Sequence, residues 1–182
     1  DYKSGQIKLI VKKQYKYFSL EAGGGYHERN FDDPSLANIS LFTYHVGLSG
    51  QNPPVGRGVI RSYINLVAES NLNDAGPGDY YFKASRYSLN AGHLFMERLP
   101  FDVTAVFQNS DYERAGGLVA MRDDDTFKLE GSLGYIVSSY STYLTVKLAS
   151  GYVDRSSNIT GRSYTNSYLA AKVDFKYGLG RR

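Results

Sequence analysis

Cysteine and tryptophan are both absent from the 182 residues of this chain. Without cysteine, the chain can form neither a disulfide nor a thiolate metal site, and small disulfide-stapled folds are excluded. An excess of one charge is also missing, because 21 Lys and Arg stand against 18 Asp and Glu, for a formal net charge of +3. A balance this close provides no basic surface for nucleic acid, so we expect no nucleic-acid partner.

Long apolar runs are missing as well. The most apolar short run is Leu9 to Val11, and it has Lys8 before it and Lys12 after it. A transmembrane helix needs about 20 apolar residues, so none is expected. The first residues, Asp1 to Lys3, show neither the basic start nor the apolar stretch of a secretory signal. A signal that has been removed and an internal start both remain open.

Tyrosine, phenylalanine and glycine are abundant instead. The chain has 17 Tyr, 9 Phe and 19 Gly. A tyrosine ring is apolar and its hydroxyl is polar, so the residue suits a surface that meets both lipid and water. Glycine in a sheet protein marks turns, bends and places where backbones approach closely. This composition favours a sheet that has one apolar and one wet face.

The dominant sequence pattern repeats every second residue, which is the period of a β-strand. The last segment shows it most clearly. One face carries Leu169, Ala171, Val173, Phe175 and Tyr177. The other face carries Tyr168, Ala170, Lys172, Asp174 and Lys176. Because successive side chains of a strand point to opposite sides, this segment predicts one apolar face and one charged face.

Similar alternation recurs along the whole chain. It is found at residues 18–27, 42–48, 60–68, 101–108, 127–138 and 143–149, and residues 7–12 and 87–96 fit it less well. Each segment has roughly 10 residues, the length of a tilted membrane-spanning strand. Short polar connections, as at 97–100 and 138–142, alternate with longer ones at 32–38, 71–79, 110–125 and 155–166. Outer-membrane barrels have short periplasmic turns and longer outer loops, so the last strand is expected to end at the periplasmic side.

A membrane barrel explains these faces better than a soluble sandwich does. The apolar faces mix large side chains with Ala and Gly, as at Ala22 and Gly24, which would fill a dry core poorly. The opposite faces carry charges of both signs, which a dry core would not tolerate. We therefore predict an all-β, antiparallel up-and-down transmembrane β-barrel with about eight to ten strands. Residues 1–182 form either one outer-membrane barrel domain or the C-terminal portion of a longer barrel.

This orientation assigns side chains to the lipid or to the enclosed space. The lipid-facing set is Leu169, Val173, Phe175 and Tyr177. The lumen-facing set is Arg61, Glu69, Lys128, Glu130, Lys147, Lys172 and Asp174. In an eight-stranded barrel the lumen set would fill the interior as ion pairs, whereas in a larger barrel it would line a weakly selective aqueous channel.

The C-terminal half carries a set of short polar motifs between its strands. They are Arg122 to Asp125, Gly134-Tyr135, Gly151-Tyr152, Asp154 to Gly161, and Tyr164-x-Asn166. With these motifs, residues 101 to 178 resemble the family called "putative β-barrel porin" type 2, which includes EpsL-like proteins of exopolysaccharide operons. The resemblance implies a bacterial outer-membrane location and a role in polysaccharide export or diffusion, and it brings no catalytic residues. The resemblance also implies that members of this family are longer chains, with more strands than the nine segments found here.

Polar residues expected in the outer loops form the remaining candidate site. They are Arg122, Asp123, Asp124, Asp125, Asp154, Arg155 and Asn158. With Arg162, the two arginines and Asp154 predict a network of charge-assisted hydrogen bonds that holds the loops together, or alternatively contacts saccharide or lipopolysaccharide. The Asp123 to Asp125 run is read as a solvated turn in preference to a cation site. No metal, cofactor or catalytic residue is expected.

Three functional hypotheses follow. The first is a passive pore, with polar or saccharide cargo. The second is a closed barrel that acts as a scaffold, an adhesin or a partner in an envelope complex. The third is a membrane-barrel lipid hydrolase, for which His27, with Glu28 and Asp32 nearby, is the best candidate. Expected partners are membrane lipids and lipopolysaccharide, together with polysaccharide or other envelope proteins.

Overall fold

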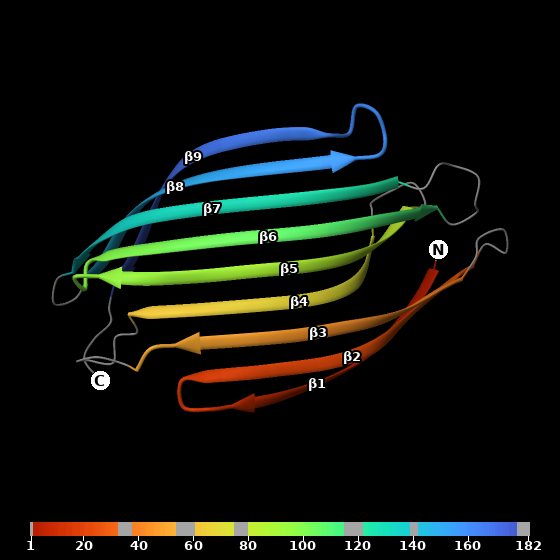
Figure 1. Ribbon diagram of the computed structural model, residues 1–182, viewed down its shortest axis with the longest axis horizontal. Coiled ribbons are helices and arrows are strands. Elements are labelled where there is room, and N and C mark those ends of the chain that lie inside the picture. Colours follow the sequence, from red (N-terminus) through yellow and green to blue (C-terminus); the bar gives the residue numbers. More distant parts are fainter. Residues whose placement is uncertain are drawn as a thin grey trace.

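The chain forms one antiparallel sheet in which each strand pairs with the next. The computed structural model describes residues 2–32, 38–53, 61–74, 80–114, 122–138 and 142–177. Figure 1 shows the strands side by side in chain order in a curved, twisted sheet. They are β1 (Tyr2–Gln14), β2 (Phe18–Phe31), β3 (Ile39–Gln51), β4 (Ser62–Asp74), β5 (Tyr80–Phe95), β6 (Leu99–Arg114), β7 (Arg122–Ser138), β8 (Thr142–Ser157) and β9 (Tyr164–Tyr177). The described residues contain no helix of the length and apolarity needed to cross a membrane.

The register of the strands separates the side chains into two faces. Phe107 of β6, for example, lies opposite Tyr87 of β5 and Phe127 of β7. Following the register across the sheet gives an apolar face, which includes Leu9, Leu20, Val46, Leu66, Leu89, Ala105, Leu129, Leu148 and Ala171. The opposite, polar face includes Glu21, Asn65, Asn90, Thr104, Glu130, Lys147 and Lys172. All nine alternating segments of the sequence are strands, and the all-β prediction is confirmed.

The apolar face is not covered by the rest of the protein. Leu169, Val173 and Phe175 are 78%, 64% and 63% exposed. Within the described ranges, the buried hydrophobic residues are Ile39, Leu72, Ala84, Ile136 and Ala149, which are too few and too small to form the core of a soluble fold. A soluble sandwich would place its large aliphatic side chains between two sheets. Here most of them stand on one side of a single sheet, so an exposed apolar surface extends over every strand.

The strands are longer than the sequence pattern indicated, with 13 to 17 residues each. Two stretches expected in outer loops belong to strands: Arg122 to Asp125 is the start of β7, and Asp154 and Arg155 lie in β8. That part of the prediction was wrong because polar composition was taken as a sign of a loop. A strand keeps its backbone hydrogen bonds whatever its side chains are, so it can extend beyond the apolar zone.

The two ends of the sheet differ in their connections. We call the end with connections 15–17, 52–61, 96–98 and 139–141 the turn end, and it lies on the left in Figure 1. The loop end has connections 32–38, 75–79, 115–121 and 158–163, which are five to seven residues long. Three turn-end connections have three residues, and two of them are at the positions where short connections were predicted. The fourth, 52–61, is the longest connection of all.

Strands β3 and β4 separate toward the loop end. Their pairing stops at His45 and Glu69, although β3 begins at Ile39 and β4 continues to Asp74. A small cluster of Ile39 and Leu72 packs there with Phe31 and Leu41. The amide of Tyr44 donates to the hydroxyl of Ser70 at 3.0 Å in place of a strand partner. A side chain therefore replaces the lost ladder bond, as buried backbone groups require.

The glycine run of β2 allows β1 to lie close against it. A Cβ atom on Gly23 or Gly25 would come within 3.0 Å of the carbonyl oxygens of Leu9 and Ile7. Gly24 points to the apolar face, where the nearest atom to its Cβ would be 3.7 Å away. Of the roles that glycine has in a sheet, Gly23 and Gly25 therefore serve the close approach of a neighbouring strand.

We expect Gly23→Ala and Gly25→Ala to lower the free energy of unfolding by about 1–3 kcal/mol each, because the added methyl group collides with backbone atoms of β1. Gly24→Ala is the matched control and should change stability by less than about 0.5 kcal/mol. Urea unfolding of the detergent-folded protein measures these differences. Equal effects of all three substitutions would contradict the close approach.

Candidate channel wall

The polar face carries charges that are paired across strands. At its β1–β4 side, the Lys12 ammonium donates to the Glu21 carboxylate at 2.5 Å. His45 lies between two carboxylates, with its ring nitrogens 3.4 Å from Glu21 and 3.5 Å from Glu69. These four residues come from four successive strands. The cluster therefore links the first hairpin to the body of the sheet by side chains as well as by backbone hydrogen bonds.

A second group of contacts crosses β4 to β8. The Tyr63 hydroxyl donates to Asp102 at 2.8 Å, and Lys147 donates to the other carboxylate oxygen at 2.9 Å. Gly92 lies between Tyr63 and Asp102 in the register. A Cβ on Gly92 would fall within 3.0 Å of the Tyr63 ring, so only glycine leaves room for the ring to lie across β5. Glycine here opens a path for a side chain to reach two strands away.

The same arrangement occurs again in β7, β8 and β9. Tyr168 donates its hydroxyl to Glu130, and the ring crosses Gly151 of the strand between them. A Cβ on Gly151 would meet the Tyr168 ring within 3.0 Å. Lys172 completes the group, with its ammonium 3.2 Å from Glu130. We call each of these arrangements, Tyr63–Gly92–Asp102 and Tyr168–Gly151–Glu130, a tyrosine bridge.

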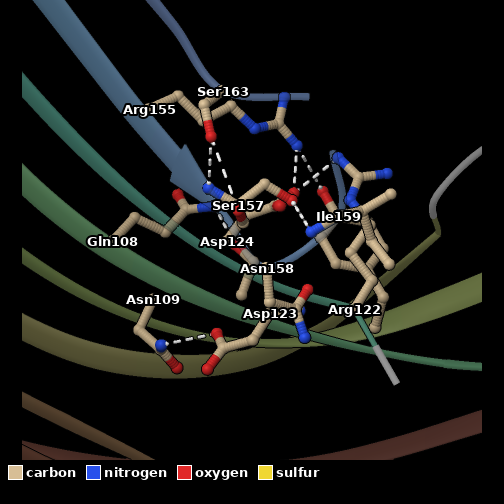
Figure 2. Close-up of polar contacts among 12 residues, drawn as sticks. Gln108, Asn109, Arg122, Asp123, Asp124, Arg155, Ser157, Asn158, Ile159 and Ser163 are labelled. Atoms are coloured by element: carbon tan, nitrogen blue, oxygen red, sulfur yellow. Dashed lines mark hydrogen bonds and ion pairs between the residues drawn. The ribbon is translucent and has the colours of Figure 1, made fainter. Parts of the chain in front are cut away.

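A cluster around Asp124 lies at the loop end of the polar face. Figure 2 shows the Asp124 side chain between those of Arg122 and Arg155. The carboxylate is 1% exposed and pairs with Arg155 and, at 2.5 Å, with Arg122. The Tyr112 ring lies 4.1 Å from the Arg122 guanidinium, and its hydroxyl accepts from Arg155 at 3.2 Å. The cluster joins β6, β7 and β8. Two cations around one buried anion are strongly attached to it, because each charge would otherwise lose its water without compensation.

The neighbouring acidic residues point to the other side of the sheet. The Asn109 amide donates to Asp123 at 2.9 Å and to Asp125 at 3.1 Å, and Figure 2 shows the first of these bonds. The Asn158 side-chain oxygen accepts from the Asp123 amide at 2.9 Å. Alternation in β7 thus divides the aspartate run between two faces. Within the described ranges, no group of three or more His, Asp or Glu side chains is placed to hold a metal ion.

Two of the arginines of the predicted loop network, Arg122 and Arg155, do share a carboxylate, but it is not Asp154. Asp154 accepts from the Thr165 hydroxyl at 2.9 Å and is not part of the arginine cluster around Asp124. Asp124 replaces it because it shares the polar face with Arg122 and Arg155, whereas Asp154 belongs to the other parity of β8. Sequence proximity suggested Asp154, and only the register between β7 and β8 selects Asp124.

The predicted lumen residues are distributed as follows. Glu69, Lys128, Glu130, Lys147, Lys172 and Asp174 all share the polar face by register. Arg61 lies at the turn end, where its guanidinium is 3.1 Å from Glu97. Of the predicted lipid-facing set, Leu169, Val173 and Phe175 share the apolar face. The Tyr177 side chain lies outside what the structure describes. That these faces meet water and lipid remains a prediction.

Sequence analysis did not find Tyr63, Asp102 and Tyr168, which form the tyrosine bridges. The alternating pattern placed each of these residues on a strand. The glycine that each tyrosine ring crosses belongs to another strand, however, so the pattern within one strand cannot reveal it. The register alone shows that Gly92 and Gly151 lie between the bridge partners. The sequence hinted at these bridges only through its high numbers of glycine and tyrosine, and such counts do not show which residues pair.

His27 is the residue on which the hydrolase hypothesis depended. Its Nε2 lies 2.8 Å from the Ser4 hydroxyl, on the polar face of β1 and β2. Glu28 is the next residue of the same strand, so its side chain points to the opposite face. The Glu28 carboxylate accepts instead from Asn30 at 3.1 Å. Glu28 therefore follows His27 in sequence but does not share its face of the sheet.

Comparison with known proteins now adds to this geometry. The family described as "Putative beta-barrel porin 2" matches residues 16–177, which is most of the chain. The chain belongs to this family. Membership points to a non-enzymatic, membrane-embedded β-barrel of the porin kind. No curated protein and no solved structure gave a match. The family matched is the one that the sequence motifs resembled, and the match extends beyond them to β2.

We expect Asp124→Asn to lower the free energy of unfolding by about 1.5–3 kcal/mol, because it removes charge-assisted bonds and leaves two arginines together. Asp123→Asn is the matched control. Asp123 is exposed on the opposite face, and its loss should cost less than about 0.5 kcal/mol. Urea unfolding in detergent micelles compares the two variants. Equal stability of the two would show that the Asp124 cluster does not hold β6 to β8 together.

Proposed function

We propose that this chain forms the wall of a passive outer-membrane channel for polar solutes. The observation that carries the proposal is the separation of the two faces over all nine strands. The polar face would line the aqueous passage, and the apolar face would contact the lipid. Membrane barrels have this arrangement because lipid demands apolar side chains while the interior can stay wet.

The charges of the polar face support weak selectivity. Glu21, Asp102, Glu130 and Asp124 each have a cation at ion-pair distance. A carboxylate that is paired in this way projects a smaller field than an isolated one does. Lys128 is exposed on the same face, on the side of β7 opposite Leu129. A channel with this wall would pass neutral solutes and ions of both signs.

The direction of the edge strands supports a wider barrel. In an up-and-down sheet of nine strands, β1 and β9 run in the same direction. Closing the sheet through these two strands would need a parallel pair, whereas the other pairs are antiparallel. Closure by a second copy, related by rotation about the barrel axis, would have the same difficulty. It would place β9 of one copy beside β1 of the other, again as a parallel pair. Closure by antiparallel pairs therefore requires an odd number of further strands, and a wider barrel leaves an aqueous passage.

The partners expected from the sequence fit this proposal. The apolar face would contact membrane lipids and, at the loop end, lipopolysaccharide, if the loop end faces outward. Polysaccharide export is a narrower version of the same proposal and needs a wall that binds sugar. A closed barrel acting as a scaffold, an adhesin or an envelope partner is the alternative, and it would conduct no ions.

Cysteine accessibility tests which face lines the passage, because the natural chain contains no cysteine. Lys128→Cys places a thiol on the polar face, and Leu129→Cys places one on the apolar face of the same strand. After reconstitution of the full-length protein in planar bilayers, a charged, membrane-impermeant methanethiosulfonate should reduce single-channel conductance of the first variant only. Lipid shields the second thiol from the reagent.

Two outcomes would overturn the proposal. The first is a folded, inserted protein that shows no conductance, which would favour the closed barrel. The second is modification of the Leu129→Cys thiol with block of the current, while the Lys128→Cys channel is unaffected. The wild-type protein treated with the same reagent controls for effects that do not involve a thiol.

A further inference from the structure

A polar hollow of about 380 Å³ lies at the turn end of the polar face. Its volume falls within the range of about 300–1,000 Å³ that is usual for small-molecule sites. The lining includes Gln14, Tyr17, Ser19, Gln51, Tyr63 and Asn65. Among the described residues, none that lines the hollow carries a charge, in contrast to the ion pairs elsewhere on this face.

The hollow continues into a row of uncharged polar side chains. In the register, Ser19, Ser49, Asn65, Asn90 and Thr104 lie opposite one another from β2 to β6. The Thr104 hydroxyl donates to the Asn90 side chain at 2.9 Å. Hydroxyl and amide groups both donate and accept hydrogen bonds. The row therefore offers alternating donors and acceptors along a line that crosses five strands.

The walls of the hollow are held in place by the surrounding backbone. The backbone N–H of Gln51 donates to the Tyr17 carbonyl oxygen at 2.8 Å, which fixes the first turn beside the end of β3. The Asn52 side chain accepts from the amides of Arg61 and Ser62 at 2.9 and 2.7 Å. Tyr63 is held by Asp102 through its tyrosine bridge. A site that is fixed in advance loses less entropy when a ligand binds.

This combination of groups matches the chemistry of sugars. A neutral saccharide presents hydroxyls that both donate and accept, and C–H surfaces that pack on aromatic rings. The amide and hydroxyl groups of the hollow can hydrogen-bond to the sugar hydroxyls, and the rings of Tyr17 and Tyr63 can pack against the C–H surfaces. In the part of the lining that the structure describes, an anionic ligand would find no cation and a cationic ligand would find no carboxylate.

We infer that the hollow is a binding subsite for a neutral oligosaccharide at the turn-end mouth of the channel. The inference rests on the proposed function, since a sugar reaches this face through the aqueous passage. It also extends that function, because it assigns a cargo class and a contact point. Uncharged side chains would hold successive sugar units weakly, so the cargo could move on along the row.

Binding to the full-length protein tests the inference. The protein is kept in an amine-oxide detergent, because glucoside detergents would themselves present sugar. Calorimetric titration with maltohexaose should show binding, whereas a galacturonate hexamer should bind at least about tenfold more weakly, because its carboxylates meet no cation. Equal or tighter binding of the anionic hexamer would overturn the inference, as would the absence of maltohexaose binding.

A pair of variants locates the binding. Gln14→Ala combined with Gln51→Ala should weaken maltohexaose binding about tenfold, because two amides that bond the sugar are lost. Gln108→Ala removes an amide from the same face outside the hollow, where it bonds to Ser110, and should leave binding unchanged. Reduced binding in both variants, or in neither, would place the sugar elsewhere. The gel shift on heating confirms that each variant is folded.

Failure of the subsite can be distinguished from failure of the channel. Conductance without sugar depends only on the passage, whereas titration in detergent depends only on the hollow. A conducting protein that binds no maltohexaose retains the proposed function and loses the subsite. A silent protein that binds maltohexaose through Gln14 and Gln51 keeps a sugar site on a barrel that is not a channel.

Discussion

The ladder of backbone hydrogen bonds between neighbouring strands is the constraint on which the rest of the structure depends. Because side chains alternate across a strand, one choice of register fixes the face of every residue. A shift of one residue between β7 and β8 would bring Lys147 and Arg155 to the face of Leu129 and Leu133. Such a shift would place charged and apolar side chains on the same face, which a membrane-embedded barrel cannot accommodate.

Glycine and tyrosine act together on the polar face. Side chains are crowded on this face, where the buried polar residues Ser19, Thr43, Asp124 and Thr145 lie. Gly92 and Gly151 relieve the crowding and let Tyr63 and Tyr168 reach acids two strands away. The bridges thereby stiffen the wall without adding net charge. The same composition that marks the chain as unusual also explains how its inner face is packed.

The two ends of the wall have different chemistry. Salt-bridged arginines around Asp124 occupy the loop end, whereas amides, hydroxyls and tyrosine rings surround the hollow at the turn end. A solute that crosses the sheet from one end to the other would pass from a charged rim to a neutral one. The Tyr168 bridge lies between these ends, whereas the Tyr63 bridge borders the hollow. In this arrangement, Tyr63 serves both rigidity and solute contact, because it forms a bridge and also lines the hollow.

The sequence by itself determined the nine strands, the apolar and polar parity of each and the porin family, because alternation and short motifs are local properties of the chain. It overestimated the loops at Arg122 to Asp125, since polarity does not separate a wet strand from a loop. Only the tertiary structure decided the pairing of Asp124 with Arg155, the two tyrosine bridges and the neutral hollow. Each of these joins residues from different strands, and the cross-strand register that brings them together has no local signature.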